Sequence, residues 1–348
     1  MDFKKDKKIL VSGVQSSGQL HIANYFGAIK QIIELVNSGE YESYIFLADY
    51  HSMTTLTNKE ERLKNTLESL ASYLALGMDK NKVNIFKQSD VPEVTELTWI
   101  FNTVTPIPML FLAHAFKDKV GNNKEDKINL DNLKNINVGL FNYPVLMAAD
   151  ILIYNADIVP VGKDQEQHIE YAREIAGKYN RSYNTNTFKE PKAFIKKDTG
   201  TIIGIDGLKM SKSKNNILPI FASNDDIKKK IMSIKTDSLS PLDKKYPDNN
   251  NIYNIHKLFL DKNKDKELRN KFLNSDKIPY SYKEAKEELY ETFINYFSSS
   301  QKKFDYYTKT EKGKKELMKI IKIGAKRANK KAQETLKKVK EETGLNFS

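Results

Sequence analysis

A polar, glycine-containing stretch near the N-terminus carries side chains suited to binding phosphate. It reads SGVQSSGQLHIANYFGA over residues 12–28, and the periodic apolar residues after it predict a helix that begins near Ile22. The first backbone N–H groups of such a helix would face a phosphate, and His21 and Asn24 could donate hydrogen bonds to it. The spacing is neither the dinucleotide fingerprint nor the P-loop, because Gly18 is followed by glutamine. The alternative for His21 is that it only caps or packs.

A second polar stretch, GLKMSKSKNN at residues 207–216, has no hydrophobic period of its own. Lys209 and Lys212 suit a triphosphate if this loop lies beside the first one. The alternative is an ordinary solvated loop, because the chain holds 57 lysine and arginine residues. Other parts of the sequence must decide between the two.

Short apolar runs predict the strands that would position these loops. The runs lie at residues 9–11, 44–47, 83–86 and 157–162, and helical spacing separates them. Strands that alternate with helices indicate an α/β fold with a Rossmann-like, doubly wound parallel sheet. Ligands of such sheets lie at the carboxyl ends of the strands.

The rest of the chain reads as mainly helical. We expect a catalytic domain at residues 1–222 with a helical insertion around 91–180, a loop at 120–137, and an all-helical domain at 223–348. The last helix is the clearest, because one apolar stripe runs along it and lysines fill the other positions. That stripe consists of Leu317, Ile321, Ala325, Ala328, Ala332, Leu336 and Val339.

Composition excludes several kinds of chemistry. The chain has no cysteine and its five histidines show no ligand spacing, so thiolate nucleophiles, disulfides and thiolate metal sites are excluded. Any metal would be a transient, oxygen-ligated ion such as Mg²⁺. With 39% hydrophobic residues but no run of 18 apolar ones, we expect a soluble, cytoplasmic protein that makes no membrane contact.

The net charge of +12 is concentrated near the C-terminus. Residues 301–340 hold 14 lysines and one arginine against four acidic residues. Such a basic face is typical of proteins that bind a polyanion, because neutralised phosphates release counterions. The alternative is the solvated surface of a lysine-rich helix.

Two signatures together identify a family that the chain resembles. HIAN at residues 21–24 is similar to the His-Ile-Gly-His signature of class I aminoacyl-tRNA synthetases, and KMSKS at 209–213 is identical to their second signature. Between them, residues 143–176 closely resemble the tryptophanyl-tRNA synthetase family of bacterial or organellar type, and much less its tyrosyl relatives. The resemblance covers essentially the whole chain and extends through residues 47–55, 116–119, 234–238 and 324–336. One departure is Ala23, which adds a methyl group where the adenine ring would approach the glycine of the signature.

The resemblance implies a two-step reaction. The carboxylate of tryptophan attacks the α-phosphate of ATP and releases pyrophosphate, and the aminoacyl group then passes to the terminal ribose of tRNA(Trp). No protein nucleophile is needed, so catalysis would consist of alignment and of stabilising charge on the phosphates, which Mg²⁺ would share. The catalytic residues it implies are Gln15, His21, Lys209 and Lys212.

The resemblance also implies a set of ATP-binding residues. Asp164 would hold the ribose, and Lys119 would reach the leaving group unless it is a solvated lysine. The implied set is Gln15, Ser16, His21, Ala23, Asn24, Lys119, Gly162, Asp164, Lys209, Met210, Ser211, Lys212 and Ser213.

For tryptophan, the resemblance assigns the contact with the indole N–H to Asp150. A carboxylate there would reject other rings, because they would leave it buried and unpaired. Without the motif, an aspartate after an apolar run would be read as a cap or a surface residue. The implied tryptophan-binding set is Gln15, His51, Tyr143, Met147, Asp150 and Gln165, whereas Gln167 and His168 are expected to be structural.

The implied partners are tRNA(Trp), whose anticodon the helical domain would recognise, and a second copy of the chain in a homodimer. Three other interpretations remain open at this point. A tyrosyl-tRNA synthetase has a similar fold and reaction, but Asp150 argues against it. A small-molecule nucleotidylyltransferase would not need so large a basic helical domain. A synthetase-like regulatory protein would not need an intact KMSKS motif.

Overall fold

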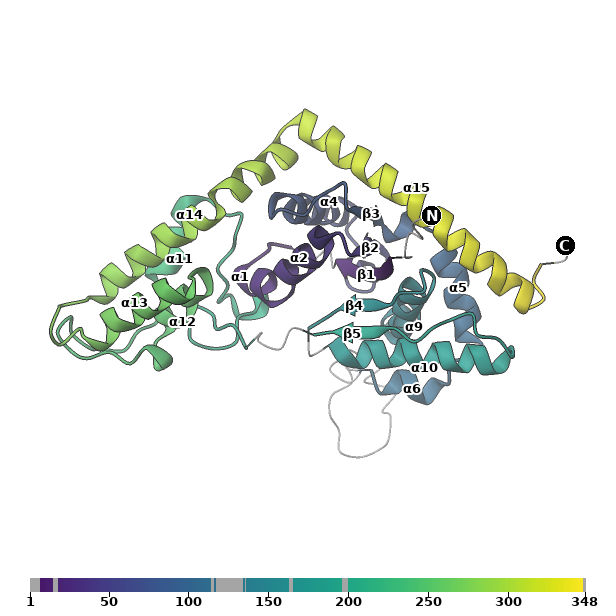
Figure 1. Cartoon of the computed structure of the whole chain (residues 1–348), viewed down its shortest axis with the longest axis horizontal. Coiled ribbons are helices and arrows are strands. Elements are labelled where there is room, and N and C mark those ends of the chain that lie inside the picture. Colours follow the sequence, from purple (N-terminus) through teal and green to yellow (C-terminus); the bar gives the residue numbers. More distant parts are fainter. Residues whose placement is uncertain are drawn as a thin grey trace, which may run out of the picture.

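The computed structural model has a five-stranded, all-parallel sheet at its centre, with strand order β3-β2-β1-β4-β5 (Figure 1). The described residues are 7–14, 18–113, 116, 134, 136–162, 165–195 and 200–346. The strands are β1 (Lys8–Val14), β2 (Tyr41–Leu47), β3 (Val83–Lys87), β4 (Ile158–Pro160) and β5 (Lys192–Phe194). The predicted α/β fold and four predicted strands are confirmed, whereas β5 was not predicted.

The sheet has one hydrophobic core on each face. Leu10 and Val11 are neighbours on β1, and because side chains alternate along a strand they enter different cores. One core is filled mainly from α2 (Lys30–Ser38), α4 (Lys59–Ala75) and the C-terminal helices, and the other mainly from the insertion helices. This arrangement is the doubly wound fold that the strand and helix pattern predicted.

The helix after β1 has an unusual first half. It begins as α1 (Ile22–Asn24), widens into one π-helical segment (Tyr25–Ile29) and continues as α2. The predicted apolar spacing is confirmed, since Ile22, Ile29 and Val36 are buried. π-helical segments inside α-helices occur frequently at functional sites.

Residues 91–180, predicted as a helical insertion, are mainly helical in the part that the structure describes. Their helices are α5 (Glu93–Asn102), α6 (Ile107–Phe111), α9 (Val138–Leu152) and α10 (Glu166–Ser182). The short α3 (Asp49–Ser52) and a 3-10 turn at Gln88–Asp90 lie just past the carboxyl ends of β2 and β3. The loop predicted at 120–137 lies mostly outside the described residues.

The C-terminal third is helical, as predicted. Its helices are α11 (Asn224–Met232), α12 (Asn251–His256), α13 (Lys262–Leu273), α14 (Tyr282–Lys309) and α15 (Glu311–Glu342). The two long helices, α14 and α15, meet at an angle, and α15 runs back to the sheet and lies along β3 (Figure 1). The predicted domain boundary at 222 stays a prediction.

The helix α15 crosses the edge of the sheet and contributes to both cores. Leu317 and Ile321 lie in one core, and Ala328 and Ala332 lie in the other, so the predicted apolar stripe is confirmed. At the crossing point stands Gly324, where a Cβ atom would lie 1.9 Å from the backbone oxygen of Ile85 on β3. Glycine therefore lets the helix cover an edge strand at backbone distance.

None of the helices in the described ranges is both long and apolar enough to cross a membrane.

Candidate active site

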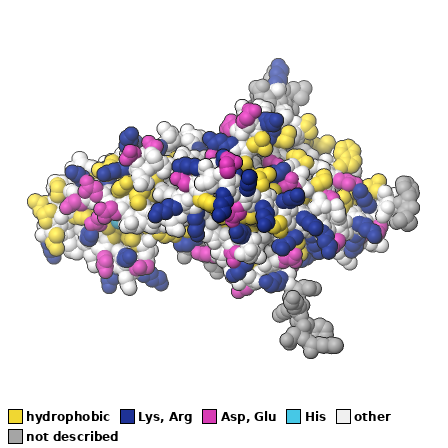
Figure 2. All heavy atoms as spheres, turned by 90° about the horizontal axis from the view of Figure 1, so that it is seen from above, with side chains coloured by type: hydrophobic (Ala, Val, Ile, Leu, Met, Phe, Trp, Pro, Cys, Tyr) yellow, Lys and Arg dark blue, Asp and Glu magenta, His cyan; other side chains and the backbone are white. Residues whose placement is uncertain are grey.

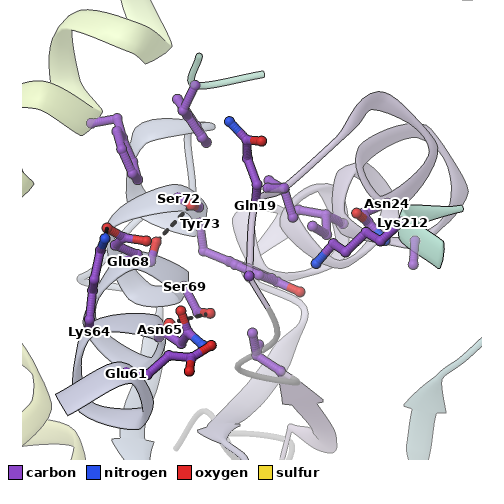
Figure 3. Close-up of a pocket in the computed structure, with 17 residues that line it drawn as sticks. Gln19, Asn24, Glu61, Lys64, Asn65, Glu68, Ser69, Ser72, Tyr73 and Lys212 are labelled. Carbon is purple, nitrogen blue, oxygen red and sulfur yellow. Dashed lines mark hydrogen bonds and ion pairs between the residues drawn. The ribbon is translucent and has the colours of Figure 1, made fainter. Parts of the chain in front are cut away.

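A cavity of about 710 Å³ lies beside the carboxyl end of β1. Gly18 lines it, and Figure 3 shows Asn24 and Lys212 on one wall and polar side chains of α4 on the opposite wall. The α4 side chains are Glu61, Lys64, Asn65, Glu68, Ser69, Ser72 and Tyr73. The two polar stretches of the sequence therefore meet at one cavity.

Lys212 reaches across the glycine turn of the first stretch. Its Nζ lies 3.6 Å from the position that a Cβ atom on Gly18 would occupy, and Gly18 has a positive φ of 53°. Lys212 remains accessible to solvent, but partial burial lowers the pKa of its ammonium group. Figure 3 shows its amino group pointing into the cavity, as a phosphate-binding lysine requires.

His21 lies near Lys212 but does not line the cavity, and only 5% of its surface is exposed. Burial and the nearby charge of Lys212 lower its pKa to about 4, so the imidazole is neutral near pH 7. Within the part of the chain that the structure describes, its Nδ1 atom has no hydrogen-bond partner. A buried polar atom of this kind leaves a hydrogen bond to be made by a ligand. Nearby, the side-chain oxygen of Asn24 accepts a 3.3 Å hydrogen bond from the backbone N–H of His21.

The lysine loop is held by Asn216, a buried residue that the sequence did not single out as functional. Its side-chain oxygen accepts from the backbone N–H of Ser211 at 2.8 Å, and its amide donates to Asp206 at 2.8 Å and to the backbone oxygen of Lys209 at 3.1 Å. A Cβ atom on Gly204 would lie 2.5 Å from the Asn216 side chain. The loop is therefore anchored at its base by one amide.

The remaining residues of the KMSKS motif have different environments. Met210 is buried in the core beneath the loop, and the hydroxyls of Ser211 and Ser213 lie 3.3 Å apart. Lys209 is exposed and does not line the cavity with Lys212. Of the two predicted lysines, Lys212 therefore lines the cavity, and Lys209 lies on the surface of the protein outside it.

A second group of predicted residues lies on one face of α9. Tyr143, Met147 and Asp150 are spaced four and three residues apart, so they share a side of the helix. Asp150 is only 2% exposed. It is therefore not the surface residue that the sequence would indicate without the family motif. Burial raises the pKa of its carboxyl group, and hydrogen bonds from His51 and Gln88 oppose that rise.

Hydrogen bonds join Asp150 to the ends of two strands. The Nε2 atom of His51, just after β2, lies 3.0 Å from Oδ2 of Asp150. The amide nitrogen of Gln88, just after β3, donates to both carboxylate oxygens at 2.9 and 2.7 Å. Gln88 was missed because its partner is 62 residues away, although its place after a strand is a signal that could have found it.

Another chain of hydrogen bonds links two residues predicted to bind the α-amino group. The hydroxyl of Tyr143 lies 2.9 Å from Nε2 of His168, and Nδ1 of His168 lies 2.6 Å from Oε1 of Gln165. The rings of Tyr143 and His51 are 6.4 Å apart, edge to face. His168, expected to be structural, therefore connects the two predicted ligands.

Some predicted residues are not brought into either group by the structure. Gly162 follows β4, and its backbone oxygen accepts a 2.9 Å hydrogen bond from Gln165. Ala23 is partly buried in α1 and packs against the core. The predicted Gln15, Ser16, Lys119 and Asp164 lie outside the described residues.

The arrangement can bind phosphate at one end and a flat ring with an N–H donor at the other. Amide and ammonium donors of Asn24 and Lys212 lie on one side of the cavity, and a buried, hydrogen-bonded carboxylate ends the second group. These are binding and charge-stabilising groups, which suits a reaction that proceeds by alignment.

Comparison with known proteins agrees with this chemistry. Residues 4–298 match the family model described as tRNA synthetases class I (W and Y). The tryptophan--tRNA ligase of Fusobacterium nucleatum is 44% identical over 96% of this chain and 97% of its own length, and that of Campylobacter jejuni is 41% identical over 97% and 99%.

Solved structures agree as well. The crystal structure of tryptophanyl-tRNA synthetase from Campylobacter jejuni complexed with ADP and tryptophan superposes with a TM-score of 0.85 at 40% identity, covering 96% of this chain and 99% of that one. A tyrosyl-tRNA synthetase from Archaeoglobus fulgidus, at 19% identity and a TM-score of 0.62, shares the fold. The chain belongs to the class I tRNA synthetases for tryptophan and tyrosine, and within them to the tryptophan--tRNA ligases.

Proposed function

We propose that the chain activates L-tryptophan with ATP, forming tryptophanyl-adenylate and pyrophosphate, and then transfers tryptophan to the 3′ end of its tRNA. The observation that carries this proposal is the pairing of a phosphate-binding cavity with the buried carboxylate of Asp150 at the same end of the sheet. The ligase relatives and the neighbouring structure, whose title names ADP and tryptophan, support it.

In the first step, Lys212 stabilises the negative charge that develops on the departing pyrophosphate. His21 is neutral, so it donates a hydrogen bond to a phosphate without adding charge, and Asn24 adds an amide donor. The attacking carboxylate of tryptophan is already ionised at pH 7 and needs no base. Gln15, Ser16, Lys119, Gly162 and Asp164 remain proposed ATP contacts, as do Ala23, Lys209, Met210, Ser211 and Ser213.

Mg²⁺ supplies further neutralisation of the phosphate charge. The chain's polar groups on the Lys212 side of the cavity are N–H donors, which suit phosphate oxygens, and the carboxylates of Glu61 and Glu68 lie on the opposite wall, whereas Mg²⁺ takes oxygen ligands. The ion would therefore be held by the phosphates of ATP and would enter with the nucleotide.

On the tryptophan side, Asp150 accepts the hydrogen bond of the indole N–H. A ring without that donor would leave the buried carboxylate short of a partner, which costs binding energy. His51 and Met147 would line the ring, Tyr143 and Gln165 would hold the α-amino group, and Gln15 would contact the amino acid or a phosphate.

The basic face of α15 suits the phosphate backbone of tRNA. Its exposed lysines recur every three to seven residues on the side opposite the buried stripe, and they span about 33 Å of helix. Figure 2, which views the molecule from above, shows lysine and arginine side chains spread over this face. The exposed lysines of α15 on this side are Lys315, Lys319, Lys322, Lys326, Lys330 and Lys337, and together they form a lysine stripe.

A homodimer is proposed because large apolar side chains are exposed on neighbouring insertion helices. The only tryptophan of the chain, Trp99 on α5, is 72% exposed, and Ile107 at α6 and Val138 at α9 are 61% and 78% exposed. Apolar groups gathered in this way mark interfaces. Sedimentation of the purified chain at about twice its 40.0 kDa mass would support this interface, and a monomer at micromolar concentration would contradict it.

We place the protein in the cytoplasm, where tRNA is charged.

Aminoacylation with purified components tests the function. The chain should attach radiolabelled tryptophan, but not tyrosine, to tRNA(Trp) in the presence of ATP and Mg²⁺. Charging with tyrosine would favour the tyrosyl alternative, and formation of an adenylate without any charging would favour a nucleotidylyltransferase.

A further inference from the structure

Gln88 is a fully buried polar residue to which no role has been assigned so far. It begins the 3-10 turn after β3, and none of its surface is exposed. An amide in such a place must form its hydrogen bonds within the protein, because water cannot reach it. Its partners therefore indicate what it is for.

Both ends of the Gln88 side chain are bonded, and the partners fix its orientation. Its nitrogen donates to the two oxygens of Asp150 at 2.9 and 2.7 Å. Its oxygen accepts from the backbone N–H groups of Tyr50 at 3.1 Å and His51 at 3.3 Å. A carboxylate only accepts and a backbone N–H only donates, so the amide has a single satisfactory orientation.

The bonding leaves Asp150 with room for one more donor. A carboxylate offers about four acceptor positions. Among the described residues, Gln88 uses two of them and His51 uses a third. The fourth position matches the single N–H donor of an indole ring.

We propose that Gln88 is the positioning residue that sets the selectivity of the site for an indole N–H, by holding the carboxylate of Asp150 in one orientation. Gln88 touches no substrate in this account and acts through Asp150. The inference rests on the proposed function, because it assumes that Asp150 meets the ring of tryptophan. A purely structural role, in which Gln88 only ties α3 to β3 and α9, makes a different prediction.

Selectivity is measured with tryptophan and with β-(benzothiophen-3-yl)alanine, in which sulfur replaces the indole N–H. The readout is kcat/KM for each amino acid in ATP–pyrophosphate exchange. The unsubstituted chain should prefer tryptophan by on the order of 10²-fold or more, because the analogue leaves the buried carboxylate without its last donor. A structural role would lower both activities equally and leave their ratio unchanged.

Two substitutions separate the roles. Gln88→Leu removes every hydrogen bond of the side chain, whereas Gln88→Glu keeps the shape and the acceptor for Tyr50 and His51 but replaces the amide donor with a second carboxyl group, which repels the carboxylate of Asp150 or shares a proton with it. In both variants the preference for tryptophan should fall about tenfold or more, mainly through a higher KM for tryptophan. If Gln88→Leu does not fold, the Gln88→Glu variant alone decides the question.

Val91→Ala is the matched control. Val91 is fully buried three residues after Gln88 and packs in the core that also holds Ala149 and Ile151 of α9, so this change lowers stability without removing a hydrogen bond to Asp150. Its preference for tryptophan should equal that of the unsubstituted chain. An unchanged preference in Gln88→Glu, or an equal loss with both amino acids, would overturn the inference. A failure of the unsubstituted chain to activate tryptophan would instead overturn the proposed function.

Discussion

At the scale of single residues, the site depends on side chains whose charge is set by burial. Lys212 is partly desolvated beside the glycine turn, and burial and the charge of Lys212 hold His21 neutral. A cation over neutral donors suits a phosphate group whose charge grows during the reaction. The roles of these two residues can therefore be tested separately.

Replacing Lys212 by alanine should slow activation of tryptophan mainly through kcat. The loss should be on the order of 10²-fold or more, because the ammonium group stabilises charge that is greatest in the transition state. Lys214→Ala is the control, since Lys214 is an exposed lysine of the same turn that does not line the cavity. If exchange kinetics show equal, small effects for both variants, Lys212 is an ordinary solvated lysine and does not stabilise the transition state.

His256 predicts how stability depends on pH. Burial lowers its pKa from 6.5 to about 4, so between these values the unfolded chain binds more protons than the folded one. The free energy of unfolding should be at its full value above pH 6.5 and should fall toward pH 4, by about 1.4 kcal/mol per pH unit for each such histidine. His21 adds a second contribution of the same sign.

The variant His256→Gln isolates the first contribution. Glutamine can still donate a hydrogen bond to Thr292, the present partner of the imidazole at 2.9 Å, but it does not titrate. Urea unfolding at several values between pH 4 and 8 should give a shallower fall for the variant. Two parallel curves would show that His256 does not titrate as its burial requires.

Sequence motifs name residues proposed to meet the ligands, but they do not name the residues that hold those side chains and loops in place. Asn24 and Lys212 line one cavity, and His21 lies close enough to Lys212 for that charge to lower its pKa. Gln88 and Asn216 were missed, because each acts through partners that folding brings close and no motif names them. Their common signal is a polar residue directly after a strand or a catalytic loop.

At the scale of elements, α15 is the part of the fold that the sequence placed least well. Its helical stripe was predicted, but its return to the edge of the sheet was not, because the amphipathic pattern gives the buried face and not the neighbour. The three-residue strand β5 was too short to carry a pattern. The apolar residues of the π-helical segment are spaced as in an ordinary helix, so the sequence pattern did not indicate the π-helix.

Gly324→Ala tests the crossing of α15 over β3. The new methyl group would lie 1.9 Å from the backbone oxygen of Ile85, so the helix must move off the strand. The expected cost is about 1–3 kcal/mol, after the roughly 1 kcal/mol that alanine gains over glycine in a helix.

Gly27→Ala serves as the control for this change. A Cβ atom on Gly27 would meet nothing within 4 Å, so only the gain in helical preference should remain. Chemical denaturation should show opposite signs for the two variants. Equal stabilisation of both would mean that α15 does not pack on β3 at backbone distance.

At the scale of the whole molecule, α15 joins the catalytic sheet to the helical third of the chain. It packs on both cores through one face and presents a stripe of lysines on the other. The sequence predicted a basic C-terminal region with a polyanion as its partner. In the structure, lysines of this region lie in a row along the exposed side of α15. An extended row of cations matches the spacing of a nucleic-acid backbone better than it matches a compact anion.

Neutralising the middle of this stripe should weaken tRNA binding without affecting activation. In the triple variant Lys319→Gln, Lys322→Gln and Lys326→Gln, the slope of log K against log salt should fall by about two to three. The control replaces Lys59, Lys178 and Lys192, which carry the same total charge on three other elements. Equal losses for the two triple variants would indicate an effect of net charge rather than of this face.

The central claim is that this chain selects tryptophan, and amino-acid-dependent ATP–pyrophosphate exchange tests it most directly. The assay is run on the purified chain with each of the standard amino acids in turn. Exchange should appear with tryptophan, stay near background with the others, and lose its selectivity in Asp150→Asn while the KM for ATP changes little. Exchange with tyrosine and none with tryptophan would contradict the account.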